Sequence, residues 1–224
     1  MQKNIVAEPQ LAGQGKQKIE WVKRNMPILR QIEDDFRKHQ YFSGLRVLVC
    51  IHLEAKTAYL AQVFAAGGAE VAVTGSNPHS TKDDVVAALA EEGMHVYARY
   101  GATPEEMRQY MNRALDVRPN IMIDDGGDIA ELVHTERQEL LPEVLGACEE
   151  TTTGVLRAKA RAKAGVLEFP VVLINDARCK YLFDNYHGTG QSVWDGVMRT
   201  TNLVVSGKTV VIIGYGWCGK GCAE

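Results

Sequence analysis

Short apolar runs alternate with helical segments along most of the chain, and this alternation limits the folds available to it. Residues 46–51 read RVLVCI, a run long enough for one buried strand, and an alanine-rich helical segment follows at 54–66. The pattern then repeats. Further strands are expected at 71–74, 94–98, 120–123, 144–147 and 171–174, with helices at 81–92, from 103, from 128 to about 135, and at 153–164. Strands separated by helices pair in parallel beneath helices on both faces. We therefore predict an α/β fold with a doubly wound, mostly parallel sheet.

Proline marks two helix starts. Apolar side chains recur at three- and four-residue steps over 16–39, which predicts a helix there. Pro27 cannot donate a backbone hydrogen bond, so we expect a break, with Pro27 near the start of a second helix. The sequence Thr103-Pro104-Glu105-Glu106 is typical of a capped helix start, with Thr103 as N-cap and Glu106 at the third helical position.

Composition excludes several classes of protein. Of 224 residues, 46% are hydrophobic and 24% are charged, which fits a folded globular protein rather than a disordered or fibrous one. The net charge of −3, without a run of Lys or Arg, argues against nucleic acid or a membrane surface as a partner. The apolar runs are strand-sized, and no signal peptide is recognisable at the N-terminus. Five scattered cysteines favour a reducing cytoplasm, and Cys218 and Cys222 lack a third metal ligand, so no metal is expected.

Polar side chains follow five of the expected strands. Parallel strands bind ligands outside their carboxyl ends, so five polar strand ends predict a single polar cleft. Any one of them alone would be only a loop. The residues concerned are His52 and Glu54, Ser76 and Asn77, Asp124, Asp125 and Asp128, Glu149 to Thr153, and Asn175 and Asp176.

The last segment predicts a second kind of site. A strand is expected at 209–213, followed by Gly214-Tyr215-Gly216-Trp217-Cys218-Gly219, the spacing of a dinucleotide-binding glycine loop. Only five residues follow, and the acidic residue expected about 20 positions further on, which would bind the ribose, is absent. We therefore expect this to be the N-terminal part of a longer protein.

Several motifs in order resemble those of the S-adenosyl-L-homocysteine hydrolase family. They are Asp124-Asp125-Gly126-Gly127-Asp128, Glu149-Glu150-Thr151-Thr152-Thr153-Gly154, Asn175-Asp176 with Lys180, Phe183-Asp184-Asn185, and the glycine loop with Gly219-Lys220-Gly221. The resemblance implies a substrate-binding domain over 1–186, then a hinge and the start of an NAD-binding Rossmann domain over 187–224. It also implies a homotetrameric cytoplasmic enzyme of the methyl cycle.

The resemblance further implies the reaction and its cofactor. Bound NAD oxidises the ribose 3′-hydroxyl of S-adenosyl-L-homocysteine, homocysteine is eliminated, water adds, and the ketone is reduced again. The reaction is a reversible hydrolysis to adenosine and L-homocysteine. It needs a base for the 3′-hydroxyl and an acid or base at the 4′ and 5′ carbons.

Site residues carry over from the resemblance by position. The catalytic set would be Lys180 with Asp184 at the 3′-hydroxyl, Asp125 with His52 at the 4′ and 5′ carbons, and Glu150 at the ribose. Substrate-binding residues would be Glu54, Lys56, Thr57, Asn175 and Asp128. NAD would contact Thr151, Thr152, Thr153, Asn185, Gly214, Gly216, Trp217, Cys218 and Gly219. Taken singly, the threonines could be helix caps, the Asp-Gly run a turn, and Lys180 a surface lysine.

One segment departs from the common family pattern and leaves the substrate open. Where many members have Thr and then Glu or Gln, this chain has Glu54 and Lys56. Glu54 only accepts and Lys56 only donates hydrogen bonds when ionised, which suits hypoxanthine, as in the S-inosyl-L-homocysteine variant of the family. Alternatively, Glu54 and Lys56 pair with each other and adenine is still accepted. Two other interpretations stay open: a plain NAD-dependent dehydrogenase and a catalytically silent binding module.

Overall fold

Strands between residues 46 and 173 form a six-stranded sheet in the computed structural model, which describes residues 4–224. The strand order is β3-β2-β1-β4-β5-β6, and the pairings of β1 with β2 and β4, of β2 with β3, and of β4 with β5 are all parallel. The strands are β1 (Arg46–Ile51), β2 (Glu70–Gly75), β3 (His95–Tyr97), β4 (Ile121–Asp124), β5 (Gly146–Glu149) and β6 (Val171–Leu173). The predicted α/β class is confirmed.

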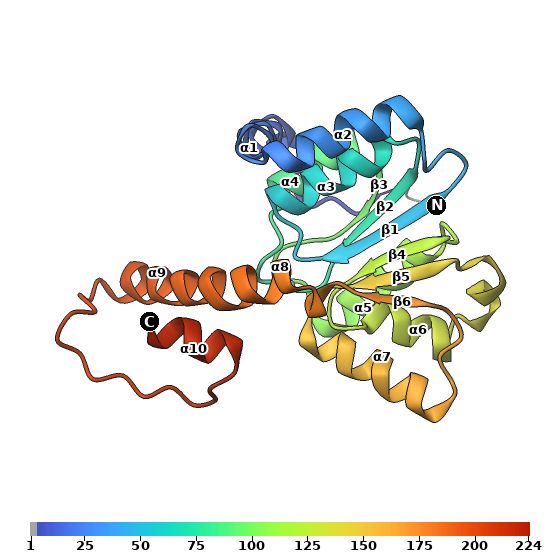
Figure 1. Cartoon of the computed structure of the whole chain (residues 1–224). Coiled ribbons are helices and arrows are strands. Elements are labelled where there is room, and N and C mark those ends of the chain that lie inside the picture. Colours follow the sequence, from blue (N-terminus) through green and yellow to red (C-terminus); the bar gives the residue numbers. More distant parts are fainter. Residues whose placement is uncertain (1–3) are drawn as a thin grey trace. The chain divides into compact units, whose positions relative to one another are not determined.

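Helices cover both faces of this sheet (Figure 1). One face carries α1 (Ala12–Asn25), α2 (Pro27–His39), α3 (Ala55–Ala66) and α4 (Asp83–Glu91). The other carries α5 (Pro104–Leu115), α6 (Asp128–Thr135) and α7 (Thr152–Ala164). Side chains of a strand alternate between faces, so Val47 and Val49 of β1 join the first core while Leu48 and Cys50 join the second. Both cores are apolar and buried, which fixes the strand register and thereby the strand ends.

Both predicted helix starts are confirmed. Pro27 is the first residue of α2, and Met26 between α1 and α2 has a non-helical backbone. Thr103 caps α5, and its hydroxyl and the Glu106 carboxylate each accept the other residue's backbone N–H. These caps satisfy amide groups that a helix start leaves without partners.

Two strand predictions were wrong. The strand expected at 144–147 lies at 146–149, because a short 3₁₀ helix, η2 (Gln138–Glu143), runs up to Val144 and leaves Leu145 59% exposed. The shift places Glu149 inside β5, at its buried end. The segment 209–213 forms no strand, because the described residues offer it no neighbouring strand to pair with, and Val211 and Ile213 are exposed.

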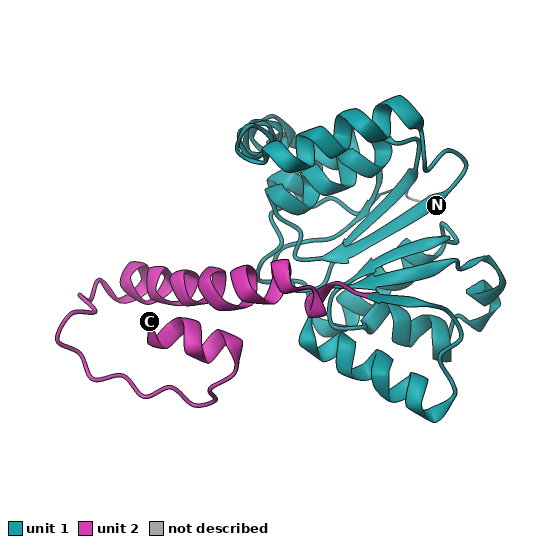
Figure 2. Cartoon of the chain, in the orientation of Figure 1, with its two compact units in different colours: residues 1–172 teal, residues 173–224 magenta. Residues whose placement is uncertain are grey.

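The chain divides into two compact units, residues 1–172 and 173–224 (Figure 2). The second unit contains short helices η3 (Ile174–Asp176) and α8 (Arg178–Lys180), a π-helix η4 (Tyr181–Gly188), and helices α9 (Thr189–Thr201) and α10 (Trp217–Ala223). Within it, Trp194 Nε1 donates to the Cys222 carbonyl at 2.9 Å. The domain boundary predicted at residue 186 stays a prediction. In residues 4–224, every helix is too short or too polar to cross a bilayer.

Candidate active site

The first unit brings candidate residues together where the strand order reverses. The chain moves outward from β1 through β2 to β3 and then returns to β4 on the other side of β1. Such a reversal leaves a crevice at the carboxyl ends of the two central strands. His52 directly follows β1, and Asp125 directly follows β4. The fold therefore explains why two residues 73 positions apart become neighbours.

His52 and Asp125 face each other at this edge. His52 Nε2 lies 3.4 Å from Asp125 Oδ2, and the same carboxylate oxygen accepts a hydrogen bond of 2.6 Å from Ser76 Oγ. The Asp125 side chain is 10% exposed and the His52 ring is 53% exposed. Thr57 donates its hydroxyl to the His52 carbonyl at 2.5 Å. The pair thus combines a fixed carboxylate with an imidazole that solvent or substrate can reach, as acid–base chemistry requires.

Two buried carboxylates hold the backbone around Asp125. Asp124 accepts the amide N–H groups of Asp125 and Ala130 at 3.0 and 2.9 Å. Glu149 Oε1 accepts the amides of Gly126 and Thr151 and the Thr151 hydroxyl, each at 2.9 Å. Asp124 and Glu149 were not predicted as catalytic or binding residues, although both were expected at strand ends. They position the loop after β4 rather than face the crevice.

Contacts with Glu149 explain Gly154 and Thr151. A Cβ built on Gly154 would collide with the Glu149 carboxylate, so this position of α7 needs glycine. Thr151 has the backbone of an N-cap but makes no side-chain cap, and its hydroxyl donates to Glu149 instead. Thr152 and Thr153 lie in the first turn of α7. Glu150 donates its amide to the Asp124 carbonyl at 3.0 Å. The contact of Glu150 with ribose and the contacts of Thr151, Thr152 and Thr153 with NAD stay predictions.

Burial changes the acidity of Asp124. Desolvation, reinforced by the charge of Glu149 and opposed by the Ala130 and Asp125 amides, raises the pKa of Asp124 from 3.8 to about 7. Folding therefore favours the protonated form. That contribution to stability is complete below about pH 4 and is lost as the pH rises through 7.

Replacing Asp124 by Asn should consequently change how stability depends on pH. Relative to the wild type, Asp124→Asn should gain stability as the pH rises from about 4 to about 7, by at most about 4 kcal/mol for a shift of this size. Urea unfolding at several pH values measures the difference, and any constant cost of altered hydrogen bonds cancels in the comparison. A difference that is flat with pH would contradict the assigned ionisation.

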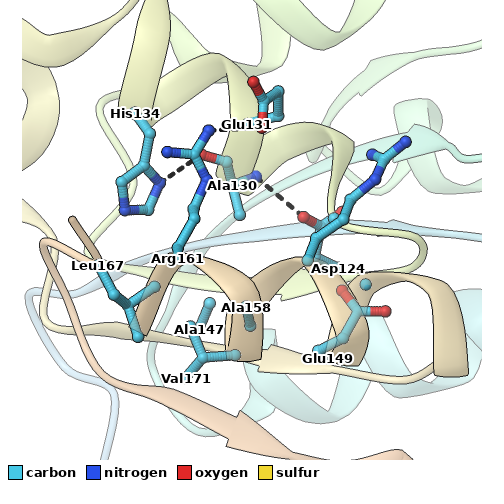
Figure 3. A pocket seen from close by; sticks show the side chains of 13 residues that line it. Asp124, Ala130, Glu131, His134, Ala147, Glu149, Ala158, Arg161, Leu167 and Val171 are labelled. Carbon is cyan, nitrogen blue, oxygen red and sulfur yellow. Dashed lines mark hydrogen bonds and ion pairs between the residues drawn. The ribbon is translucent and has the colours of Figure 1, made fainter. Parts of the chain in front are cut away.

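A small pocket lies behind these carboxylates. Figure 3 shows Asp124 and Glu149 at one end of it and His134 and Leu167 at the other. Its volume of about 20 Å³ is far below that of a nucleoside.

Asp128, predicted to bind substrate, is ion-paired with Arg157 at 2.6 Å. A substrate role for Asp128 would have to compete with this pair.

Glu54 and Lys56 contact each other at the start of α3. The Glu54 carboxylate caps the helix by accepting the Lys56 amide at 3.1 Å, and Lys56 Nζ lies 3.8 Å from the same oxygen. Glu54 therefore has a structural role in addition to any role at the purine. The side chains are 30% and 66% exposed respectively, so both can also reach a ligand.

The second unit carries the other candidate cluster. Lys180 Nζ donates to Asn185 Oδ1 at 2.6 Å and to Asn175 Oδ1 at 3.2 Å, and it lies 3.3 Å from Asp184 Oδ2. Asn185 also donates to Asn175 Oδ1 at 2.9 Å. Lys180 is 14% exposed, so it is not a solvated surface lysine. The π-helix η4 brings Asp184 and Asn185 to the lysine, and such helices often occur at functional sites.

The glycine loop has the backbone that a dinucleotide loop needs. Gly214 adopts φ +97°, which favours glycine. A Cβ on Gly219 would collide with the Gly214 carbonyl, so glycine allows close packing there. Nothing lies within 4 Å of the Cβ position at Gly216, which leaves room for a phosphate to approach the backbone. Trp217 and Cys218 open α10. These features fit NAD.

Comparison with known proteins gives family matches to two parts of the chain. A family model described as S-adenosyl-L-homocysteine hydrolase matches residues 3–143. The chain belongs to the S-adenosyl-L-homocysteine hydrolase family. A second model, for the NAD-binding domain of S-adenosyl-L-homocysteine hydrolase, matches residues 185–224. The family resemblance seen in the sequence is thus confirmed.

Named relatives of the family carry two different substrate names. The chain is 57% identical over 218 residues to adenosylhomocysteinase of Pyrococcus abyssi, covering 97% of this chain and 52% of that protein. It is 54% identical over 210 residues to S-inosyl-L-homocysteine hydrolase of Methanocaldococcus jannaschii, covering 94% and 51%. The chain spans about half the length of the curated relatives it matches.

Proposed function

We propose that the protein to which this chain belongs catalyses the NAD-dependent, reversible hydrolysis of S-adenosyl-L-homocysteine to adenosine and L-homocysteine. The observation that carries this proposal is the His52–Asp125 pair at the strand-order reversal, 3.4 Å apart and held by Ser76. Family membership and the name of the Pyrococcus abyssi relative support it. Against a silent binding module, Asp125, Glu150, Lys180 and Asp184 all retain side chains capable of the chemistry.

NAD would be held by the glycine loop together with the polar side chains that the family resemblance implies. The residues proposed to hold it are Thr151, Thr152, Thr153, Asn185, Gly214, Gly216, Trp217, Cys218 and Gly219. When bound, NAD supplies reversible oxidation at the ribose 3′ carbon. A plain dehydrogenase would release reduced cofactor at each turnover, whereas the proposed reaction returns it to the oxidised form.

The chain's own residues would move protons at two places. Lys180, oriented by Asn175, Asn185 and Asp184, would exchange the proton of the 3′-hydroxyl at Nζ. Asp125 would take the proton from the 4′ carbon, and His52 would protonate the departing sulfur at the 5′ carbon. Water addition reverses both transfers. Glu150 and Asn175 would hold the ribose.

A second substrate is favoured by a specific observation. Glu54, an acceptor, and Lys56, a donor, form a loose pair of 3.8 Å at the start of α3, and together they match the N1–H and O6 of hypoxanthine. The Methanocaldococcus jannaschii relative is named S-inosyl-L-homocysteine hydrolase. S-inosyl-L-homocysteine is therefore the alternative substrate.

The synthetic direction tests both candidates. Full-length protein loaded with NAD is incubated with homocysteine and either adenosine or inosine, and the thioether is quantified by chromatography. Condensation with adenosine supports the main proposal, and condensation with inosine alone supports the alternative. Reaction with neither nucleoside, despite bound NAD, favours a binding module.

The two residues at the purine give a sharper prediction if inosine is preferred. The double variant Glu54→Thr, Lys56→Gln should shift the ratio of kcat/KM toward adenosine by about 10-fold or more, since each polar group that the bound purine leaves unpaired costs about 1–3 kcal/mol. Because Glu54 also caps α3, Glu54→Asp is the matched control, as it keeps a capping carboxylate. Unchanged selectivity in the double variant would contradict the assignment.

We also propose that the protein is a cytoplasmic homotetramer of the methyl cycle, where it removes a product that inhibits methyltransferases. Family resemblance supports both statements. Light scattering of the full-length protein in solution measures its mass, and a mass other than four chains would contradict the tetramer.

A further inference from the structure

Two serines after β2 contact the two partners of the His52–Asp125 pair. The loop that carries them, residues 76–82, is tied to the β1 side by backbone hydrogen bonds from Ser76 to the Ile51 carbonyl at 3.2 Å and from Lys82 to the Leu53 carbonyl at 3.0 Å. These bonds lie on either side of His52 in the sequence. The loop is therefore held in place against the histidine and cannot shift independently of it.

Ser80 contacts the ring nitrogen that faces away from Asp125. Its hydroxyl oxygen lies 2.6 Å from His52 Nδ1 and 3.1 Å from the Asn77 carbonyl. A carbonyl can only accept, so the Ser80–Asn77 contact is a hydrogen bond when Ser80 donates its single proton to Asn77. The Ser80 oxygen then accepts a proton from His52. The hydrogen-bond network thus assigns the proton to Nδ1.

Ser76 acts on the carboxylate side. It donates to Asp125 Oδ2, the oxygen that faces His52 Nε2. With Nδ1 protonated and Ser76 stabilising the carboxylate, the proton on Nε2 is the one that can be transferred. In a histidine, the hydrogen bond at one ring nitrogen sets which nitrogen carries the proton. Without a partner at Nδ1, the His52 ring could rotate, or its proton could sit on the other nitrogen.

We propose that Ser80 is a positioning residue that fixes the Nδ1 proton of His52 and so makes Nε2 the atom that exchanges protons with the substrate. This inference rests on the proposed function. In the elimination, the bond between the 5′ carbon and sulfur breaks, the electron pair stays on sulfur, and Nε2 gives sulfur its proton. When water adds at the same carbon, Nε2 takes a proton from that water, which restores the imidazolium.

The test separates two partial reactions in full-length, NAD-loaded protein. Oxidation at the 3′ carbon is followed by the near-ultraviolet absorbance of the reduced nicotinamide, and elimination is followed by release of homocysteine. Ser80→Ala should lower the rate of homocysteine release by about 10- to 100-fold while the oxidation step keeps its rate. Ser80→Thr, which retains the hydroxyl, should restore most of the loss.

A matched control is Thr81→Val. The Thr81 hydroxyl donates to the same Asn77 carbonyl at 3.0 Å, so this variant loses a comparable bond of the loop while the Ser80–His52 bond remains. It should show wild-type rates in both steps.

¹⁵N NMR of the histidine rings gives a readout independent of turnover. Wild-type His52, identified with His52→Gln, should carry a proton on Nδ1.

The outcomes distinguish this inference from the proposed function. Equal loss of both steps in Ser80→Ala, no loss at all, or a His52 ring protonated only at Nε2 would overturn the positioning role. A wild-type protein that releases no homocysteine and condenses neither nucleoside would instead overturn the proposed function, while the NMR measurement would still test the proton on Nδ1.

Discussion

Lys180→Ala is expected to reduce turnover by about 10²- to 10⁴-fold, the range for loss of a positioned acid or base. Lys180 is 14% exposed and is surrounded by three oxygen acceptors within 3.3 Å. Removing it deletes the group proposed to exchange the 3′-hydroxyl proton. The loss should fall on the oxidation step, so substrate added to the NAD-loaded variant should produce no nicotinamide absorbance change on the wild-type timescale.

Arg178→Ala is the control for this variant. Arg178 is an exposed cation on the same short helix, α8, so the replacement removes the same charge two residues away. It should leave turnover near that of the wild type. Lys180→Ala with normal oxidation and slow homocysteine release would contradict the role assigned to Lys180. Together with Ser80→Ala, the variant tests whether the two clusters act on different steps.

Glu33→Ala should lower the free energy of unfolding by about 1–3 kcal/mol, the range for leaving a buried hydrogen-bonding group without its partner. Glu33 is 5% exposed, and its carboxylate binds Lys23 of α1 at 2.8 Å, Arg37 of α2 at 2.6 Å and Tyr59 of α3 at 2.8 Å. The variant would leave the Lys23 ammonium and the Tyr59 hydroxyl without their acceptor. Urea unfolding measures the change.

A neighbouring residue provides the control, and pH provides a second readout. Asp34→Ala removes an exposed carboxylate from the next position and should change stability by less than about 0.5 kcal/mol.

Burial opposes ionisation of Glu33, but the hydrogen bonds from Lys23, Tyr59 and Arg37 outweigh it, and the pKa of Glu33 is lowered. The stabilisation is therefore present above the ordinary glutamate pKa and is lost as the pH falls. The difference between wild type and Glu33→Gln should shrink in acid, and a difference that grows would contradict the ion pair.

Local patterns predicted most of the fold because each carries its own physical cause. Pro27 lacks an amide proton, and Thr103 with Glu106 can cap a helix without help from distant residues. The two wrong strand predictions lie where the conformation of a segment depends on the elements beside it. Val144 and Leu145 are as apolar as a strand requires, but the preceding 3₁₀ helix delays β5. The segment 209–213 has strand composition but has no strand beside it among the described residues.

The candidate site was predicted in part for the same reason. His52 and Asp125 could be named because strand ends and family motifs mark them. Ser80 and Glu149 were missed as site residues because their importance depends on three-dimensional contacts, a ring nitrogen in one case and three amide and hydroxyl donors in the other. Spacing in the sequence does not show which atoms a hydroxyl or carboxylate reaches.

The central position of β1 has a consequence for folding. β1 is synthesised before both of its neighbours, which arrive at different times: β2 begins at residue 70, but β4 begins only at residue 121. Until then, one edge of β1 has no partner, and such edges invite pairing with other chains. His52 cannot meet Asp125 before that edge is closed. Formation of the His52–Asp125 pair therefore marks the end of the interval in which this edge of β1 is open to pairing with other chains.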